Sequence, residues 1–247
     1  MLLIDNYRDR LVRRLSQLLL GLTLYGVSMA LMIESTLGLD PWDVFHQGLA
    51  RTTGLTIGAV TALVGAVVLL MWIPLRQRPG LGTVCNVVVI AVAVDVALML
   101  LPTARSLPTQ VSFMVAGIVG NGAATGLYIG ARLGPGPRDG LMTGFAARRP
   151  GLSLRLVRTV IEVTVLAAGW ALGGTVGVGT VAYALSIGPL AQLALAIFTV
   201  PPTPPSHVPD KRPKDSGDRP KLPAPSESVV SEDRRGRRIH SGVRERA

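Results

Sequence analysis

Residues 37–48 read LGLDPWDVFHQG, and residues 133–144 read LGPGPRDGLMTG. Leucine, two glycines, proline and aspartate recur at the same offsets in both stretches, which begin 96 residues apart (133 − 37). A peptide that returns with this spacing indicates an internal repeat, and the fold has to explain why one chain carries it twice.

The repeat continues beyond this peptide. With one residue inserted near residue 150, GLGTV at residues 80–84 aligns with GVGTV at residues 177–181, and Ile90 aligns with Ile187. The two copies therefore cover most of the apolar part of the chain.

The composition is that of a membrane protein rather than of a soluble domain. Apolar residues make up 49% of the 247 residues and charged residues 16%, and no lysine precedes Lys211. The formal net charge of +10 does not indicate nucleic-acid binding, because the basic residues flank apolar runs or lie after Val200. In those places they serve as topology signals.

Six apolar runs are long enough to cross a hydrocarbon core of about 30 Å, which takes about 20 residues. Arginines concentrate in the N-terminal segment, in the second and fourth loops and in the C-terminal tail. The positive-inside rule then predicts a multi-pass protein of the plasma membrane with both termini in the cytoplasm. The six predicted spans are residues 15–33, 57–75, 84–101, 111–129, 156–172 and 180–200.

A repeat of three spans crosses the membrane an odd number of times, so its second copy must enter from the opposite side. The predicted fold is an all-α membrane protein of six transmembrane helices, built as two inverted three-helix repeats at residues 15–104 and 105–200. A cytoplasmic segment, residues 1–14, precedes them. Residues 201–247 hold nine of the 18 prolines among charged residues, which predicts a disordered basic cytoplasmic tail.

Four motifs in the same order resemble a known family. They are LGLDPWDVFHQGLA from Leu37, PGLGT from Pro79, LGPGPRDGLMTG from Leu133 and LVRTVIEV from Leu156. Together they are similar to the YczE/YyaS/YitT family of uncharacterised bacterial membrane proteins, over about residues 15–200. The resemblance implies an integral membrane protein of unknown substrate, and no catalytic or binding residue comes with it.

Each copy of the peptide predicts a short helix. In the first copy Asp40 can cap the helix, with Pro41 at its first position and Asp43 in its first turn. In the second copy Gly136 replaces the cap, while Asp139 keeps its place. Either the two aspartates only cap interfacial helices, or the helices dip toward each other and place their N-termini and carboxylates at a central site.

Further polar residues lie within the predicted spans. Asp95 lacks a partner in its own helix and aligns with Gln192, whereas Glu162 follows Arg158 by one helical turn and can form an ion pair with it. Since a charge at the centre of a membrane helix costs about 2.5–3.5 kcal/mol, such groups are expected to face the bundle interior. The candidate substrate or ion site therefore comprises Asp43, Asp139, Asp95, Glu162, Arg158 and Gln192.

The sequence contains no recognisable motif of an enzyme or a metal site. Cys85 is the single cysteine and excludes an intramolecular disulfide, and the three histidines follow no catalytic or zinc-binding spacing. The glycine-rich stretch from Gly173 lacks the lysine of a phosphate loop. We therefore predict no enzymatic activity, no catalytic residue, no cofactor and no bound metal.

Inverted repeats give a protein two related states that open to opposite sides of the membrane. The sequence thus predicts a transporter or permease that moves a small solute or ion by alternating access. The alternative is a non-transporting accessory protein that aids assembly or secretion of another component, and a membrane enzyme comes third. Expected partners are membrane lipids and the solute; a homo-oligomer is compatible with the sequence, and nucleic acid is not expected.

Overall fold

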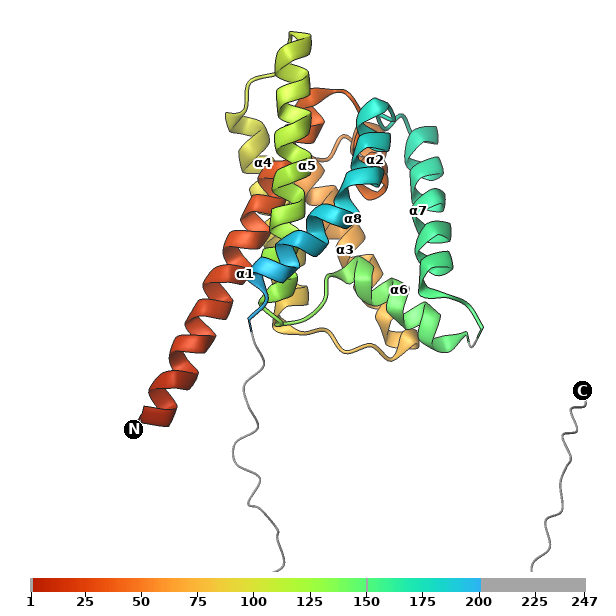
Figure 1. Ribbon diagram of the computed structural model, residues 1–247. Helices are drawn as coiled ribbons and strands as arrows, with labels where there is room; N and C mark the ends of the chain where they lie inside the picture. Colours follow the sequence, from red (N-terminus) through yellow and green to blue (C-terminus); the bar gives the residue numbers. More distant parts are fainter. Residues whose placement is uncertain (1, 150, 201–247) are drawn as a thin grey trace, which may run out of the picture. The chain divides into compact units, whose positions relative to one another are not determined.

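The computed structural model describes residues 2–149 and 151–200, with side chains from residue 11 onward. The predicted disordered tail, residues 201–247, lies outside the described residues. Within them the chain forms eight α-helices and no β-strand (Figure 1). The helices are α1 (Leu2–Ser35), α2 (Pro41–Thr53), α3 (Ile57–Leu75), α4 (Leu81–Leu100), α5 (Leu107–Gly130), α6 (Pro137–Arg148), α7 (Leu154–Ala171) and α8 (Val178–Phe198).

Five of these helices are long and apolar enough to cross a membrane, namely α1 from Leu11 onward, α3, α4, α5 and α8. They correspond to five of the six predicted spans. The remaining one, at residues 156–172, forms helix α7 of 18 residues but is not among the five. Three charged residues lower its hydropathy, namely Arg155, Arg158 and Glu162. At 1.5 Å per residue its length of about 27 Å still approaches the thickness of the hydrocarbon core.

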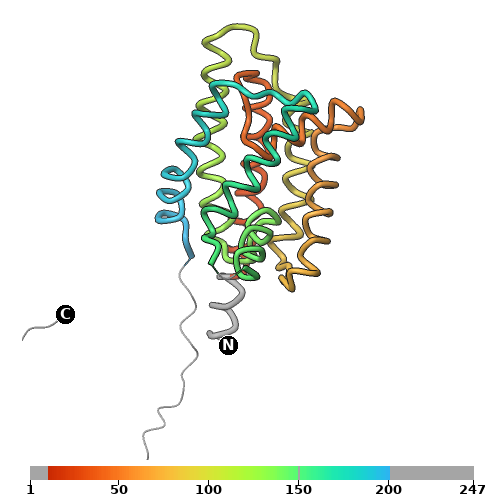
Figure 2. Tube along the Cα trace, turned by 90° about the vertical axis from the view of Figure 1, so that its right-hand side faces the viewer, coloured from red at the N-terminus to blue at the C-terminus, as the bar shows by residue number. Residues whose placement is uncertain are grey.

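The long helices α1 and α5 pack along each other, and the other helices pack around them in matching pairs. Helix α4 packs on α1 as α8 packs on α5, while α2 packs on α7 as α6 packs on α3. The short helices lie near opposite ends of the long ones, α2 near the top and α6 near the bottom of Figures 1 and 2. Each short helix is thus held by a helix from the other half of the chain.

The backbone of the two halves is also alike at its turns. In the second half the amide of Gly179 donates to the carbonyl of Leu37 at 2.8 Å, and in the first half the amide of Gly82 donates to the carbonyl of Leu133 at 2.8 Å. The described residues with left-handed backbone form four pairs, 96 or 97 residues apart: Thr36 and Arg132, Gly38 and Gly134, Gly54 and Gly151, and Arg76 and Gly173.

The two halves differ in one packing contact. Helix α3 packs along α4, whereas α7 makes almost no backbone contact with α8, which runs away from it toward the lower side of Figure 1. Pro189 inside α8 follows Gly188 and has no N–H to donate to the carbonyl of Leu185, which favours a bend. Helix α4 carries Ala91 and Val92 at the aligned positions.

The contact between α3 and α6 depends on Gly140. Trp72 of α3 is buried, and its indole Nε1 donates to the carbonyl of Pro137 at 3.1 Å. A methyl group on Gly140 would overlap the indole ring. We therefore expect Gly140→Ala to lower the free energy of unfolding by about 1–3 kcal/mol through overpacking, measured by thermal unfolding of the purified protein. Gly188→Ala meets no atom within 4 Å and is the matched control; equal stability of the two variants would contradict the packing argument.

Candidate functional site

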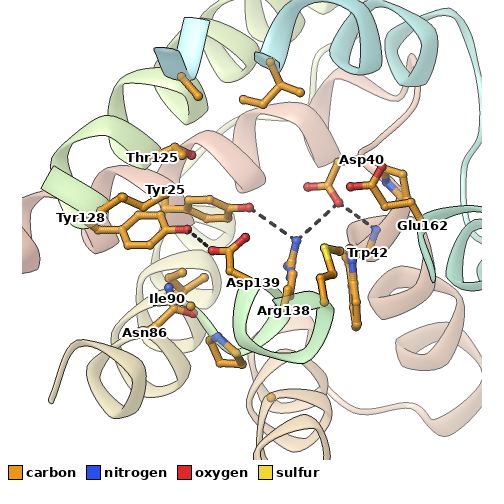
Figure 3. A pocket seen from close by; sticks show the side chains of 18 of the residues that line it. Tyr25, Asp40, Trp42, Asn86, Ile90, Thr125, Tyr128, Arg138, Asp139 and Glu162 are labelled. Carbon is orange, nitrogen blue, oxygen red and sulfur yellow. Dashed lines mark hydrogen bonds and ion pairs between the residues drawn. The ribbon is translucent and has the colours of Figure 1, made fainter. Parts of the chain in front are cut away.

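A cavity of about 340 Å³ lies between the helices, and all eight of them contribute lining residues. The first residues of both short helices reach it: Asp40, Pro41 and Trp42 at the start of α2, and Pro137 and Arg138 at the start of α6. The two copies of the repeated peptide therefore meet at one cavity (Figure 3).

Asp40 makes the predicted N-cap of α2. Its Oδ1 accepts the backbone N–H groups of Trp42 at 2.8 Å and of Asp43 at 3.0 Å, which confirms the prediction. The side chain is 2% exposed, and its Oδ2 has no hydrogen-bond partner among the described residues. Asp40 lies outside the five helices that are long and apolar enough to cross a membrane. Burial raises its pKa to about 7, the Asp43 carboxylate adds to the rise, and the Arg138 guanidinium opposes it.

Arg138 reaches from the start of α6 to the start of α2. Its Nη2 lies 3.3 Å from Asp43 Oδ1 and its Nη1 lies 3.7 Å from Asp40 Oδ1, so one guanidinium joins two carboxylates. The guanidinium carbon also lies 5.3 Å from the centre of the Trp42 ring, a distance typical of a cation–π interaction. Trp42 and Arg138 occupy the same position in the repeated peptide, so the two copies contact each other through equivalent residues.

Asp139 has different partners from Asp43, its equivalent in the repeat. Its Oδ2 accepts a hydrogen bond from the Tyr128 hydroxyl at 3.1 Å. The Tyr128 ring packs edge-on against Tyr25 with ring centres 6.3 Å apart, and the Tyr25 hydroxyl lies 3.5 Å from Arg138 Nη1. Figure 3 shows the two tyrosines on one side of Arg138 and Asp40 on the other. The two repeated aspartates thus belong to one polar cluster.

Neither repeated aspartate makes the side-chain cap that was one of its two predicted roles. Asp40 supplies the cap of α2, and Asp43 instead pairs with Arg138 while fully buried. Helix α6 begins after Gly136, as predicted, and has no side-chain cap. Asp139 accepts a hydrogen bond from the Tyr128 hydroxyl and none from the backbone amides at the start of α6. A role of these carboxylates in substrate binding remains a prediction.

Three other predicted site residues line the same cavity. Arg158 and Glu162 of α7 form the predicted ion pair at 2.8 Å, one turn apart, and both are partly exposed. Gln192 of α8 also lines the cavity. The charge of Glu162 is thus neutralised within its own helix, as the spacing indicated.

Asp95 lies apart from this cavity. Its carboxylate accepts hydrogen bonds from the Thr56 hydroxyl at 2.6 Å and from the amide of Gly58 at 2.7 Å. Asp95 on α4 therefore helps to cap the start of α3, although its repeat equivalent Gln192 lines the central cavity. The partners of Asp95 lie at the start of the preceding helix, α3, so residues of its own helix could not reveal them.

Sequence reasoning missed Arg138 and His46 as parts of the site. Arg138 was interpreted as a topology signal, although its position in the repeated peptide pointed to the site. The Nδ1 of His46 lies 3.3 Å from Asp43 Oδ1. Burial, with a contribution from Arg138, lowers the pKa of His46 to about 3, so its imidazole is neutral at neutral pH.

The comparisons with known proteins agree with the resemblance drawn from the four motifs. The chain is 40% identical over 197 residues to an uncharacterized protein of Haemophilus influenzae, covering 80% of this chain and 88% of the relative. It is 33% identical over 190 residues to the uncharacterized membrane protein YczE of Bacillus subtilis, covering 76% and 88%. It is 24% identical over 165 residues to the uncharacterized protein YyaS of the same organism, covering 65% and 82%.

No solved structure matches the chain. The relationship to YczE and the five apolar helices together identify a membrane protein. Residues 12–195 match a family of unknown function (DUF6198), a stretch that contains both copies of the repeated peptide. The resemblance to YczE and YyaS is therefore confirmed, and the chain belongs to the DUF6198 family.

Proposed function

We propose that this protein is a transporter or permease that moves a small solute or ion across the plasma membrane by alternating access. The observation that carries the proposal is the cavity at which the N-termini of α2 and α6 meet, with Asp40, Arg138 and Asp139 in its lining. Transporters of several folds bind their substrates near the middle of the membrane, between short or broken helices contributed by two repeats.

In this proposal the two halves form an inverted repeat with both termini in the cytoplasm. Its support is the matched packing of the helices, the four pairs of left-handed residues and the reciprocal hydrogen bonds to Leu37 and Leu133. Helices α1 and α5, which are equivalent in the repeat, run in opposite directions in Figure 1. Opposite directions are what inversion of the second copy requires.

The unequal packing of the halves supports the existence of two states. Here α3 lies against α4 while α7 lies away from α8. Exchange of these two arrangements between the halves would pack α7 on α8 and release α3 from α4. Such an exchange closes the cavity on one side and opens it on the other, which is the motion that alternating access needs.

A pair of hydrogen-bonding positions fits the same exchange. The Tyr183 hydroxyl of α8 donates to Asn121 Oδ1 of α5 at 3.1 Å. In the repeat alignment the equivalents are Asn86 and Tyr25, the same two residue types with their places exchanged. In the first half the Tyr25 hydroxyl instead lies beside Arg138.

The proposal is tested by flux into proteoliposomes that contain only this protein, with labelled small cations, neutral solutes and anions, and with and without a proton gradient. Asp43→Asn and Asp139→Asn should each accumulate normally, since asparagine keeps the size of the side chain. Each should reduce flux at least about tenfold by removing a charge, that of Asp139 from the cavity lining and that of Asp43 from the buried cluster beside it, a change equivalent to about 1.4 kcal/mol. Asp95→Asn, outside the cavity, is the control. Flux no greater than that of empty liposomes for every solute class would favour the accessory role.

A further inference from the structure

We propose that the space beside Asp40 and Trp42 binds a small organic cation with N–H donors, such as a primary ammonium or a guanidinium. This inference rests on the proposed transport function and adds the chemical class of its substrate. It follows from the charge of the cluster, from the buried oxygens that lack donors and from the way the protein's own guanidinium is held there.

The charges of the cluster do not balance. Asp40, Asp43 and Asp139 surround a single guanidinium, that of Arg138, and the Arg158–Glu162 pair on the cavity wall is neutral as a whole. With all three carboxylates ionised, the cluster carries an excess of negative charge. A bound monovalent cation reduces that excess, whereas a bound anion increases it.

Two carboxylate oxygens are buried without donors. Asp40 Oδ2 and Asp43 Oδ2 have no hydrogen-bond partner among the described residues, and both side chains are at least 98% buried. Figure 3 shows the Asp40 carboxylate in the cavity. Buried ionised oxygens without donors are costly, and N–H groups of a ligand would satisfy the one of Asp40, which lines the cavity; Asp43 does not line it and acts on the ligand through its charge. The Nε1 of Trp42 is also without a partner and suits an acceptor atom on the same molecule.

Arg138 indicates what this part of the cavity recognises. An aromatic face combined with carboxylates is a common arrangement for binding organic cations, and Trp42, Asp40 and Asp43 provide it around the guanidinium. The distances of 3.3 and 3.7 Å exceed the roughly 2.7–2.9 Å of a tight charged hydrogen bond, so the carboxylates retain capacity for further donors. The Arg138 side chain is 25% exposed, so it does not fill the space beside Asp40 completely.

The two helix N-termini would by themselves favour an anion. At α2, however, Asp40 already accepts the first free amide groups. At α6, Asp139 places a carboxylate in the first turn. Asp40 therefore occupies the position that an anionic ligand would use at α2, and the carboxylate of Asp139 in the first turn of α6 disfavours an anion there, so the cluster favours positive charge and N–H donors.

Binding to the purified wild-type protein in detergent tests the inference. The probes are propylammonium and methylguanidinium, with propionate and propanol as the matched anion and neutral molecule. Both cations should bind saturably by calorimetry and raise the midpoint of thermal unfolding, and the matched molecules should not. Saturable binding of propionate, or equal effects of propanol and propylammonium, would overturn the proposal.

Variants locate the binding. Asp40→Asn should fold, because asparagine is about as good an N-cap as aspartate, and should lower the affinity for propylammonium at least about tenfold. Asp43→Asn, which leaves the cap of α2 intact, should lower it similarly. Asp95→Asn makes the same chemical change outside the cavity and should keep wild-type affinity. Unchanged affinity in both Asp40→Asn and Asp43→Asn would refute this location.

Protons should compete with the cation at Asp40. Asp40 loses its charge as the pH falls below its pKa of about 7, so affinity for propylammonium should fall about tenfold from pH 8 to pH 6. His46 is already neutral in this range. In Asp40→Asn this pH dependence should disappear, and its persistence would show that another group is responsible. The titratable or charged groups around Asp40 are Tyr25 of α1, Asp43 and His46 of α2, Arg138 of α6 and Tyr183 of α8.

Failure of this inference can be distinguished from failure of the transport proposal, because binding in detergent requires no transport. Binding of propylammonium without flux of any solute would overturn transport and keep the cation site. Flux of a neutral or anionic solute by a protein that does not bind propylammonium would overturn the cation site and keep transport.

Discussion

Arg138→Gln is expected to lower the free energy of unfolding by about 3 kcal/mol, because it leaves Asp40 and Asp43 buried without the guanidinium that joins them. Removal of one partner from a buried ion pair costs about 3–5 kcal/mol, and the partial exposure of Arg138 places the expected effect at the lower end. Thermal and chemical unfolding of the purified variant in detergent measure it.

Compensating substitutions separate loss of charge from loss of packing. In the background of Asp40→Asn and Asp43→Asn, the same Arg138→Gln change should cost much less, since no unpaired carboxylate remains in contact with it. Arg138→Lys keeps the charge but not the planar fork, and should lie between wild type and Arg138→Gln. If Arg138→Gln lowers the free energy of unfolding as much in the background of Asp40→Asn and Asp43→Asn as it does in the wild type, then Arg138 acts through packing alone.

A cross-link between α3 and α4 is expected to abolish transport. A Cβ at Gly65 would lie 3.6 Å from the Cβ of Val87, within the range of about 3.5–4.5 Å found in disulfides. In a protein with Cys85 replaced by serine, oxidised Gly65→Cys/Val87→Cys should hold α3 on α4 and so prevent one of the two proposed states. Flux in proteoliposomes should then fall to the level of empty liposomes.

Reduction of this disulfide should restore flux, and each single cysteine variant should retain flux under oxidising conditions. The locked protein should still bind propylammonium, because Asp40 and Trp42 are unchanged and the cross-link, although Gly65 and Val87 also line the cavity, holds the present arrangement. Wild-type flux by a preparation whose cross-link is complete on a gel would show that α3 does not need to leave α4.

The parts of the structure that local rules govern could be predicted from the sequence. The start of α2 at its Asp40 cap, the start of α6 after Gly136 and the Arg158–Glu162 pair depend on residues within about four positions of one another, and each of the five spans depends on one continuous run of about 20 residues. Helix capping and one-turn spacing are properties of a short segment. They do not depend on how the rest of the chain folds.

The central cluster could not be predicted in the same way. The ion pairs of Arg138 join residues 95 or more positions apart, and the sequence gives no measure of how closely the two helix starts approach. The same limitation applies to Asp95, whose partners belong to a different helix. The two short helices that the repeated peptide predicted are present, and both supply residues of the cluster.

The separation of charges along the chain has a consequence for synthesis in the cell. When α2 has left the ribosome, Asp40 and Asp43 have no counter-charge, because Arg138 is still to be translated. Helix α7, on which α2 packs, follows later still. The first half must therefore remain in the membrane without the partners that neutralise the charges of α2 and pack most extensively on it, so translation rate and the insertion machinery should govern the yield of folded protein. The two halves, produced as separate polypeptides, should each be degraded unless they are made together.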